Sequence, residues 1–139
     1  MSGLFLDIVT PSKTIFSGDI NSIAVPGTNG SFQVLKNHAP IISTFEIGVL
    51  KIETVTGKKY YATGGGTIEV LNNRIQVLAD SLEAIDEIDF TRAESALKRA
   101  KERLSNISSQ EKIDVARAEA AMARALNRIK LVSKHSTEN

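Results

Sequence analysis

Apolar and polar residues alternate with a period of two from the start of the chain to about Ala79. The alternation is visible at Leu4, Leu6 and Ile8, at Leu50 and Ile52, at Ile68 and Val70, and at Ile75 and Val77. A period of two is typical of strands that bury one face. Turn-forming residues separate these runs, and Asn72-Asn73 suits a two-residue hairpin because Asn tolerates positive φ. The pattern predicts an antiparallel sandwich or barrel.

After Asp86 the apolar residues recur every three or four positions, which indicates helices. The stripes comprise Phe90, Ala93, Leu97, Ala100 and Leu104, and then Val115, Ala118, Met122, Ala125, Ile129 and Val132. Asp86 or Asp89 could cap the first helix. The connection near 105–109 is short and polar, so the two helices must run antiparallel. We therefore predict a β + α fold, with an antiparallel β-sandwich over 1–85 and an antiparallel two-helix hairpin over 86–139.

The two predicted helices carry one motif twice. Ile88-Asp89-x-x-Arg92-Ala93-Glu94 returns 25 positions later as Ile113-Asp114-x-x-Arg117-Ala118-Glu119, and the likeness continues beyond. Three arginines follow one side of each helix beside the apolar stripe: Arg92, Arg99 and Arg103, and then Arg117, Arg124 and Arg128. These side chains are either solvated or paired with Glu94, Glu102 and Glu119. Alternatively, the folded hairpin gathers their guanidinium groups around a polyanion.

Composition excludes several classes of function. The chain has 17 basic and 16 acidic residues, so it lacks the basic excess of a generic nucleic-acid or membrane-surface binder. Cys is absent, and the only histidines, His38 and His135, argue against a metal site. Gly64-Gly65-Gly66 lacks the Lys-Ser/Thr of a phosphate loop, and we expect it to bend or pack a strand. With no signal peptide, membrane span or catalytic set apparent, we expect a soluble, non-catalytic protein on the cytosolic side.

Four segments in order resemble the epsilon subunit of bacterial F-type ATP synthase. They are Gly30-Ser31-Phe32-Gln33-Val34-Leu35-Lys36-Asn37-His38-Ala39-Pro40, Gly64-Gly65-Gly66-Thr67-Ile68-Glu69-Val70, Val77-Leu78-Ala79-Asp80 and Ile88-Asp89-Phe90-Thr91-Arg92-Ala93. The resemblance covers nearly the whole chain. It implies a sandwich of about ten strands followed by two helices.

The same resemblance implies a non-catalytic subunit in the central stalk of a proton-translocating rotary ATP synthase. Its partners would be the gamma subunit and the ring of c subunits, with Ser31 and His38 in the segment that faces the ring. The catalytic alpha/beta hexamer would be a further partner when the hairpin extends and blocks hydrolysis. Neither nucleic-acid binding nor membrane insertion is implied. The location would be the cytoplasmic face of the bacterial plasma membrane, within a peripheral membrane complex.

In some members of the family the compact hairpin binds ATP. The matching positions here are Glu83, Asp89, Arg92, Arg99, Arg124 and Arg128. ATP would then be a regulatory ligand and no cofactor would be required, while a role for Mg²⁺ stays open. The chain departs from the family at Ser31, which stands where a carboxylate contact to the c ring is common.

Two other hypotheses compete with a stalk subunit. The chain could be a stand-alone ATP-sensing module in which the sandwich is an adaptor. An RNA-binding arginine hairpin is disfavoured because Glu94, Glu102 and Glu119 lie among the basic residues.

Overall fold

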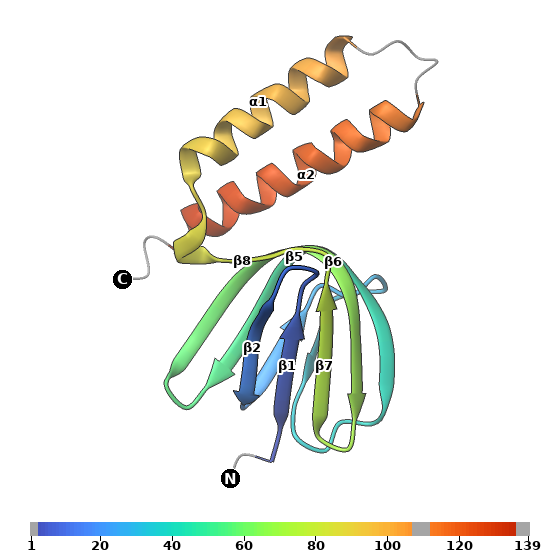
Figure 1. The fold of residues 1–139 in the computed structure, drawn as a ribbon, viewed down its shortest axis with the longest axis vertical. Coiled ribbons are helices and arrows are strands. Elements are labelled where there is room, and N and C mark those ends of the chain that lie inside the picture. The colour runs from blue at the N-terminus through green and yellow to red at the C-terminus, as the bar shows by residue number, and fades with distance from the viewer. Residues whose placement is uncertain (1–2, 107–111, 136–139) are drawn as a thin grey trace. The chain divides into compact units, whose positions relative to one another are not determined.

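The computed structural model describes residues 3–106 and 112–135. The chain divides into two compact units, residues 1–85 and residues 86–139. The first unit contains strands and the second contains helices (Figure 1). The strands of the first unit are β1 (Phe5–Val9), β2 (Thr14–Asp19), β3 (Ser22–Val25), β4 (Phe32–Val34), β5 (Ile41–Thr54), β6 (Gly57–Leu71), β7 (Arg74–Ala79) and β8 (Leu82–Ala84). A short 3₁₀ turn (Ile85–Glu87) precedes α1 (Phe90–Asn106) and α2 (Lys112–His135).

The sandwich arises because its two longest strands pass through both layers. One layer follows the order β2-β1-β7-β6-β5 and uses the end of β6 and the start of β5. The other layer contains β8, the start of β6, the end of β5, β3 and β4. β5 and β6 therefore each act as two strand segments, which reconciles eight strands in the described residues with the expected ten or so. The predicted sandwich-then-hairpin fold is confirmed.

The corner between the layers lies where the β5–β6 register passes from Phe45↔Gly66 to Ile47↔Gly64. Gly65 lies between these pairs with φ +103°, a conformation that favours glycine. Its amide donates to Thr63 Oγ1 at 3.2 Å, and its carbonyl accepts the amide of Asp80 at 2.8 Å. The bend that was predicted for the three glycines therefore turns the chain from one layer to the other. Figure 1 shows the strong curvature of both strands.

The core of the sandwich is built from the alternating apolar residues. Leu6, Ile8, Ile52, Ile68 and Val77 are completely buried. Burying each such side chain contributes about 1.5–3 kcal/mol. The Asn72-Asn73 turn also forms as predicted, because both residues have positive φ, 52° and 64°, and they join the antiparallel strands β6 and β7. One pair departs from the antiparallel expectation, since β1 and β7 run parallel.

Candidate functional site

The two helices of the second unit pack through small side chains. Ala93 and Ala100 of α1 are 2% and 3% exposed, and Ala118 and Ala125 of α2 are completely buried. These four residues come from the predicted apolar stripes. Because α1 ends at Asn106 and α2 begins at Lys112, the helices run antiparallel (Figure 1). Alanine at the contact favours a close approach of the two axes, near the lower end of the usual range of about 8–10 Å.

Asp89 caps α1. Its carboxylate Oδ1 accepts a hydrogen bond from the backbone N–H of Arg92 at 3.1 Å, and its carbonyl accepts the amide of Ala93 at 3.0 Å. An N-terminal carboxylate is also favoured by the helix dipole. Of the two residues proposed as a cap, Asp89 is therefore the one that fills the position. The capping hydrogen bond uses Oδ1 of the Asp89 carboxylate and does not involve Oδ2.

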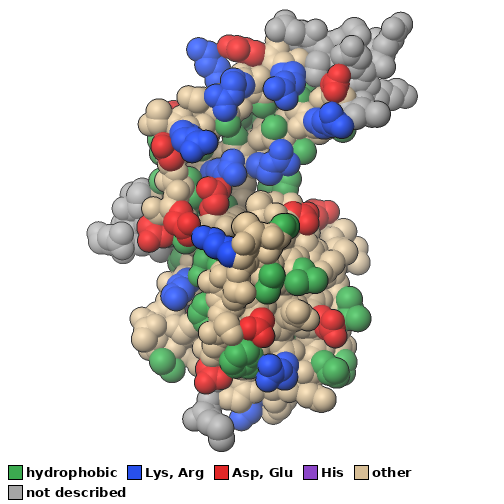
Figure 2. Space-filling model, viewed as in Figure 1, with side chains coloured by type: hydrophobic (Ala, Val, Ile, Leu, Met, Phe, Trp, Pro, Cys, Tyr) green, Lys and Arg blue, Asp and Glu red, His purple; other side chains and the backbone are tan. Residues whose placement is uncertain are grey.

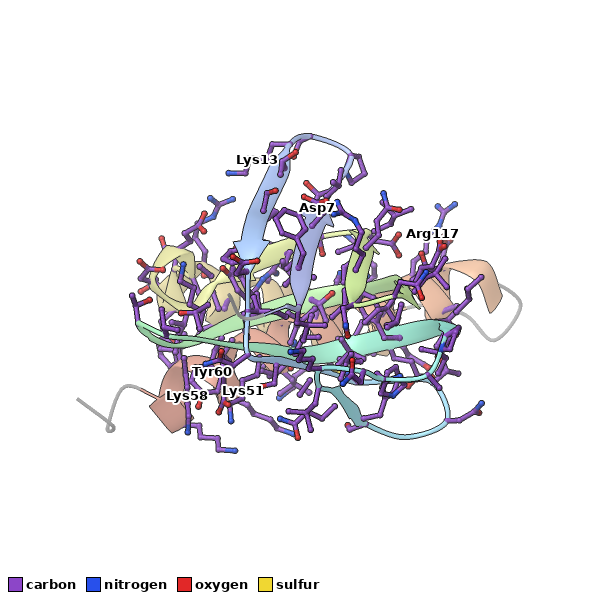
Figure 3. The ribbon with its side chains drawn as sticks, turned by 90° about the horizontal axis from the view of Figure 1, so that it is seen from below. Asp7, Lys13, Lys51, Lys58, Tyr60 and Arg117 are labelled. Atoms are coloured by element: carbon purple, nitrogen blue, oxygen red, sulfur yellow. The ribbon has the colours of Figure 1, made fainter. Side chains whose placement is uncertain are left out.

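Both helices carry their arginines on exposed or half-buried positions beside the alanine contact. Arg92, Arg99, Arg103 and Arg117 are exposed, whereas Arg124 and Arg128 are half-buried. Arg117 is labelled in Figure 3. Figure 2 shows many blue Lys and Arg side chains over the two helices, and few on the visible face of the sandwich. The hairpin thus carries six of the chain's seven arginines, all except Arg74.

Five of these six guanidinium groups form no ion pair within the described residues. Within residues 3–106 and 112–135, no carboxylate oxygen lies within 4.0 Å of a guanidinium nitrogen of Arg92, Arg99 or Arg124. The same holds for Arg103 and Arg117. Pairing with Glu94, Glu102 and Glu119 is therefore not formed by these five arginines in the described residues. Four of the five, Arg92, Arg99, Arg103 and Arg117, are exposed, and guanidinium donors of this kind suit phosphate oxygens.

Of the six candidate ATP-binding residues, five belong to the hairpin unit: Asp89, Arg92, Arg99, Arg124 and Arg128. The sixth, Glu83, lies on β8 of the sandwich unit, where it is half-buried and pairs with Ala62 of β6. Asp89 and Arg92 are brought together by the cap. Arg99 follows on the same helix, and Arg124 and Arg128 lie on the partner helix.

The segment from Ser31 to Pro40, which includes β4, carries the other two candidate residues. Ser31 is exposed just before β4. His38 is half-buried, and its Nδ1 lies 2.7 Å from the carbonyl oxygen of Ala39. Asn37 has φ +66°, and its amide donates to Asn73 Oδ1 at 2.6 Å. This bond anchors the segment at Asn37 to the β6–β7 turn.

Sequence reasoning missed an apolar surface near this segment. Ile42, Leu35 and Leu71 are 77%, 54% and 49% exposed. A shallow groove of about 370 Å³ is lined by Pro40, Ile41, Ile42, Glu69, Val70 and Leu71. The available signal was the pairs Ile41-Ile42 and Val70-Leu71, since consecutive apolar residues on a strand point to opposite faces. One member of each pair must therefore point outward.

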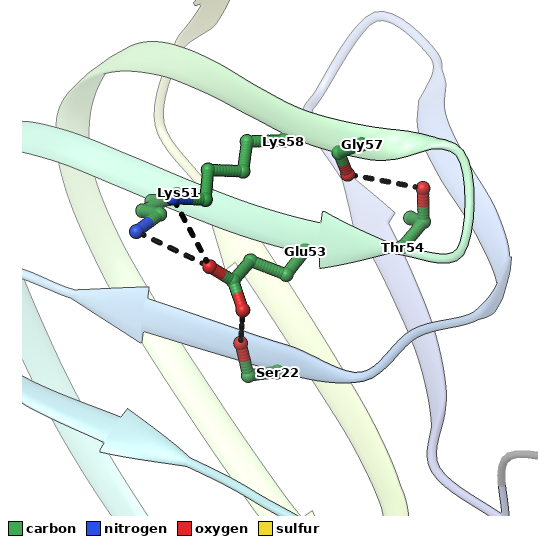
Figure 4. Close-up of polar contacts among 6 residues, drawn as sticks. All are labelled: Ser22, Lys51, Glu53, Thr54, Gly57 and Lys58. Atoms are coloured by element: carbon green, nitrogen blue, oxygen red, sulfur yellow. Dashed lines mark hydrogen bonds and ion pairs between the residues drawn. The ribbon is translucent and has the colours of Figure 1, made fainter.

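A polar cluster lies on β3, β5 and β6 and contains none of the candidate residues. Glu53 Oε1 pairs with Lys51 Nζ at 3.4 Å and with Lys58 Nζ at 3.8 Å (Figure 4). Ser22 Oγ donates to Glu53 Oε2 at 3.3 Å. Lys51 also lies 6.0 Å from the centre of the Tyr60 ring (Figure 3). The hydrogen bond from Lys51, followed by the positive charges of Lys51 and Lys58 and the bond from Ser22, lowers the pKa of Glu53.

In the described part of the chain, no group of three or more His, Asp or Glu side chains is arranged to hold a metal ion. The helices of this part are also too short or too polar to cross a membrane. The hairpin presents a surface rich in arginine, and the sandwich presents exposed apolar side chains. Surfaces of this kind are typical of a subunit that binds partners.

Comparisons with known proteins agree with that class. Residues 3–85 match the family model described as ATP synthase, Delta/Epsilon chain, beta-sandwich domain. Residues 86–133 match the model described as ATP synthase, Delta/Epsilon chain, long alpha-helix domain. The chain belongs to the epsilon-chain family of F-type ATP synthase, whose members are non-catalytic stalk subunits, and the resemblance of its four motifs is thereby confirmed.

Curated relatives are similar over most of their length. The ATP synthase epsilon chain of Salinibacter ruber is 44% identical over 110 residues, which cover 73% of this chain and 74% of the relative. That of Desulforamulus reducens is 45% identical over 107 residues, covering 76% and 80%.

Two solved structures share the fold. A chain of the Euglena gracilis mitochondrial ATP synthase (OSCP/F1/c-ring) superposes with a TM-score of 0.75 at 20% identity, covering 88% of this chain and 77% of that one. A chain from the Tetrahymena thermophila mitochondrial ATP synthase central stalk and c-ring gives a TM-score of 0.61 at 14% identity, covering 94% and 96%.

Proposed function

We propose that this subunit couples the rotor to the c ring and inhibits ATP hydrolysis through a hairpin that binds ATP when compact. The observation that carries the proposal is that Arg92, Arg99 and Arg124, on the two helices that follow the Asp89 cap, form no ion pair within the described residues. Arg92, Arg99, Arg124 and Arg128 supply the phosphate contacts, and Asp89 and Glu83 supply polar contacts that orient the motif or the ligand. ATP is a regulatory ligand here, and no cofactor is required.

The physical basis of the switch is charge repulsion. Clustered guanidinium groups repel one another in the compact hairpin, and a triphosphate relieves that repulsion. A ligand that binds only the compact state stabilises it by RT ln(1 + [ATP]/Kd), about 2.7 kcal/mol at a hundredfold excess over Kd. The alanine contact buries little apolar area, so a change of this size is enough to shift the hairpin between states. When the hairpin extends, the same arginines meet acidic surfaces of the catalytic alpha/beta hexamer.

The sandwich supplies the rotor contacts in this proposal. The anchored segment with Ser31 and His38 faces the polar loops of the c ring, and the gamma subunit binds strand edges and loops. The exposed side chains of Ile42 and Leu71 support such an interface, because contiguous exposed apolar residues mark docking surfaces. The assembled complex then lies at the cytoplasmic face of the bacterial plasma membrane and translocates protons. Family membership leads us to propose the ATP response within this complex, rather than in a stand-alone module.

Two experiments on the assembled enzyme test the proposal. Removing the residues after Ile85 should retain ATP synthesis and raise ATP hydrolysis, since the inhibitory element is gone. The full-length subunit, added back under the same conditions, is the control. A Cys introduced at Ser31 should crosslink to a c subunit, while a Cys at Val55, 89% exposed in the β5–β6 turn, controls for non-specific reaction. Unchanged hydrolysis, or Ser31 crosslinks only to catalytic subunits, would contradict the proposal.

A further inference from the structure

The repeated motif gives the hairpin an approximate two-fold symmetry. Two copies of a motif on antiparallel helices are related by an axis perpendicular to both helices. Rotation about this axis exchanges Ala93 with Ala118 and Ala100 with Ala125, and all four are buried at the contact. Rotation about this axis exchanges the two helices but does not exchange the two broad faces of the hairpin. Both arginine stripes therefore lie on one face, which we call the basic face.

The register of the two helices follows from their ends. Antiparallel helices joined by a short connection have their adjacent ends at about the same height. Ala100 lies six residues before the end of α1 at Asn106, and Ala118 lies six residues after the start of α2 at Lys112, so we infer that these two alanines lie at about the same height. By the same count Ala93 stands level with Ala125. The two-fold axis consequently passes near Ala96 and Ala121, which are 25 positions apart in the repeat.

This register divides the arginines into two sets. At 3.6 residues per turn, the three arginines of each helix point within roughly 20° of one direction. Along the hairpin axis, Arg92 of α1 lies at a height between those of Arg124 and Arg128 of α2. We call these three residues the proximal triad. Arg99 and Arg103 lie on either side of the level of Arg117, and we call these three the distal triad. The two-fold axis exchanges the triads.

We propose that the distal triad, Arg99, Arg103 and Arg117, is a second binding site for a triphosphate group. This goes beyond the proposed function, whose ATP site is centred on the proximal triad and adds Arg99 from near the axis. Asp114 is the counterpart of Asp89 in the repeat and is exposed in the first turn of α2. Each triad thus has a carboxylate at its outer end and presents two arginines from one helix and one from the other.

The three positive charges of the distal triad outnumber the one carboxylate at its outer end, Asp114, and therefore favour an anion. Its three guanidinium groups are exposed and form no ion pair within the described residues. Glu119 lies roughly 200° around α2 from Arg117, on the other side of the helix, and Glu102 lies roughly 80° from the stripe of α1. The triads are roughly 13 Å apart along the hairpin, given a rise of about 1.5 Å per residue. That distance exceeds the Debye length of about 8 Å at physiological salt, so the repulsion between ligands bound at the two triads is largely screened.

The test measures binding stoichiometry on the full chain with inorganic tripolyphosphate, by calorimetry and by native mass spectrometry. The wild-type protein should bind two equivalents. Arg103→Gln with Arg117→Gln should bind one, and Arg92→Gln with Arg128→Gln should also bind one, by losing the other. AMP, which has one phosphate, should bind at least tenfold more weakly than ATP or tripolyphosphate at both triads. Lys98→Gln with Lys101→Gln, which removes two exposed charges from other sides of α1, should leave two equivalents.

The outcomes separate this proposal from the proposed function. One equivalent on the wild-type protein that the Arg103/Arg117 variant keeps overturns the distal site, yet leaves ATP binding at the proximal triad intact. If the wild-type protein binds one equivalent and both double variants weaken that binding, a single ligand spans the basic face. This result would also contradict a second site. Circular dichroism of each variant verifies that α1 and α2 are retained.

Discussion

The backbone N–H of Arg92 donates a hydrogen bond to Asp89 Oδ1 at 3.1 Å. This contact explains the spacing of the motif Ile88-Asp89-x-x-Arg92-Ala93. Asp89 starts the helix, Ala93 is buried four residues later at the contact with α2, and Arg92 lies beside Ala93 on the basic face. One short motif therefore sets where α1 begins, how it packs and where its first guanidinium group lies.

Two substitutions of Asp89 should distinguish the contribution of its capping hydrogen bond to hairpin stability from the contribution of its negative charge. Asp89→Ala should destabilise the hairpin by about 0.5–2 kcal/mol because the Arg92 amide loses its acceptor. Asp89→Asn should keep most of the helix stability, since Asn caps nearly as well. The measurement is the helical circular dichroism signal during thermal unfolding of both variants. Equal losses for Ala and Asn would mean that the carboxylate charge, rather than the cap, stabilises α1.

A methyl group at Gly66 should destabilise the sandwich. A Cβ at Gly66 would collide with the carbonyl oxygen of Leu78, and it would lie 2.9 Å from both Ala79 Cα and Phe45 Cζ. Overpacking of this kind costs about 1–3 kcal/mol. Gly18→Ala is the matched control, because the nearest atom to its Cβ is 3.7 Å away. Chemical denaturation of the sandwich should show a loss for Gly66→Ala that Gly18→Ala lacks.

Glu53 should make a small, pH-dependent contribution to stability. Its pKa lies below the ordinary value of 4.5, chiefly because Lys51 donates a hydrogen bond to the carboxylate. The contribution is therefore present above the unfolded-state pKa and is lost as the pH falls through the lower folded-state pKa. Glu53→Gln should be less stable than the wild-type protein at pH 7, and the difference should vanish in acid. A difference that grows on acidification would contradict this assignment. Thermal unfolding across pH 3 to 7 measures it.

The sandwich should fold without the hairpin. Its core is made of residues from β1 to β8, and the chain divides into compact units after Ile85. A chain that ends at Ile85 should therefore keep a single cooperative thermal transition and a strand-type circular dichroism spectrum. Loss of that transition would show that residues beyond 85 complete the core.

Local patterns in the sequence predicted the elements, while the pairing of distant strands could not be predicted. Alternation at Ile68 and Val70 identified a strand, and the spacing of Ala93 and Ala100 identified the buried side of α1. The parallel pairing of β1 with β7 joins segments far apart in the chain, and no local pattern encodes it. The passage of β5 and β6 through both layers depends on the bulge at Gly65, whose φ of +103° is a property of the folded backbone.

The candidate site was predictable to a similar extent. Helical spacing placed Arg92 and Arg99 beside the alanine contact, because a helix has one fixed period. The cap formed by Asp89 was one of two alternatives until the structure located the first turn of α1. That Arg124 forms no ion pair in the described part of the chain depends on side-chain conformations, which periodicity does not determine. The exposed side chain of Ile42 could not be predicted from alternation, because an apolar residue beside a buried one on a strand departs from the pattern of buried apolar and exposed polar positions.

Titration of the full chain with ATP in a calorimeter tests the central claim most directly. The wild-type protein should release heat on binding and should gain thermal stability in millimolar ATP. Arg92→Ala should weaken binding by tenfold or more, since a hydrogen bond to a charged group contributes about 1.5–3 kcal/mol. Lys101→Ala, which removes an exposed charge from the other side of α1, should bind as the wild-type protein does. If the wild-type protein shows neither heat of binding nor a thermal shift in millimolar ATP, the arginines form only a solvated helix surface and the claim is wrong.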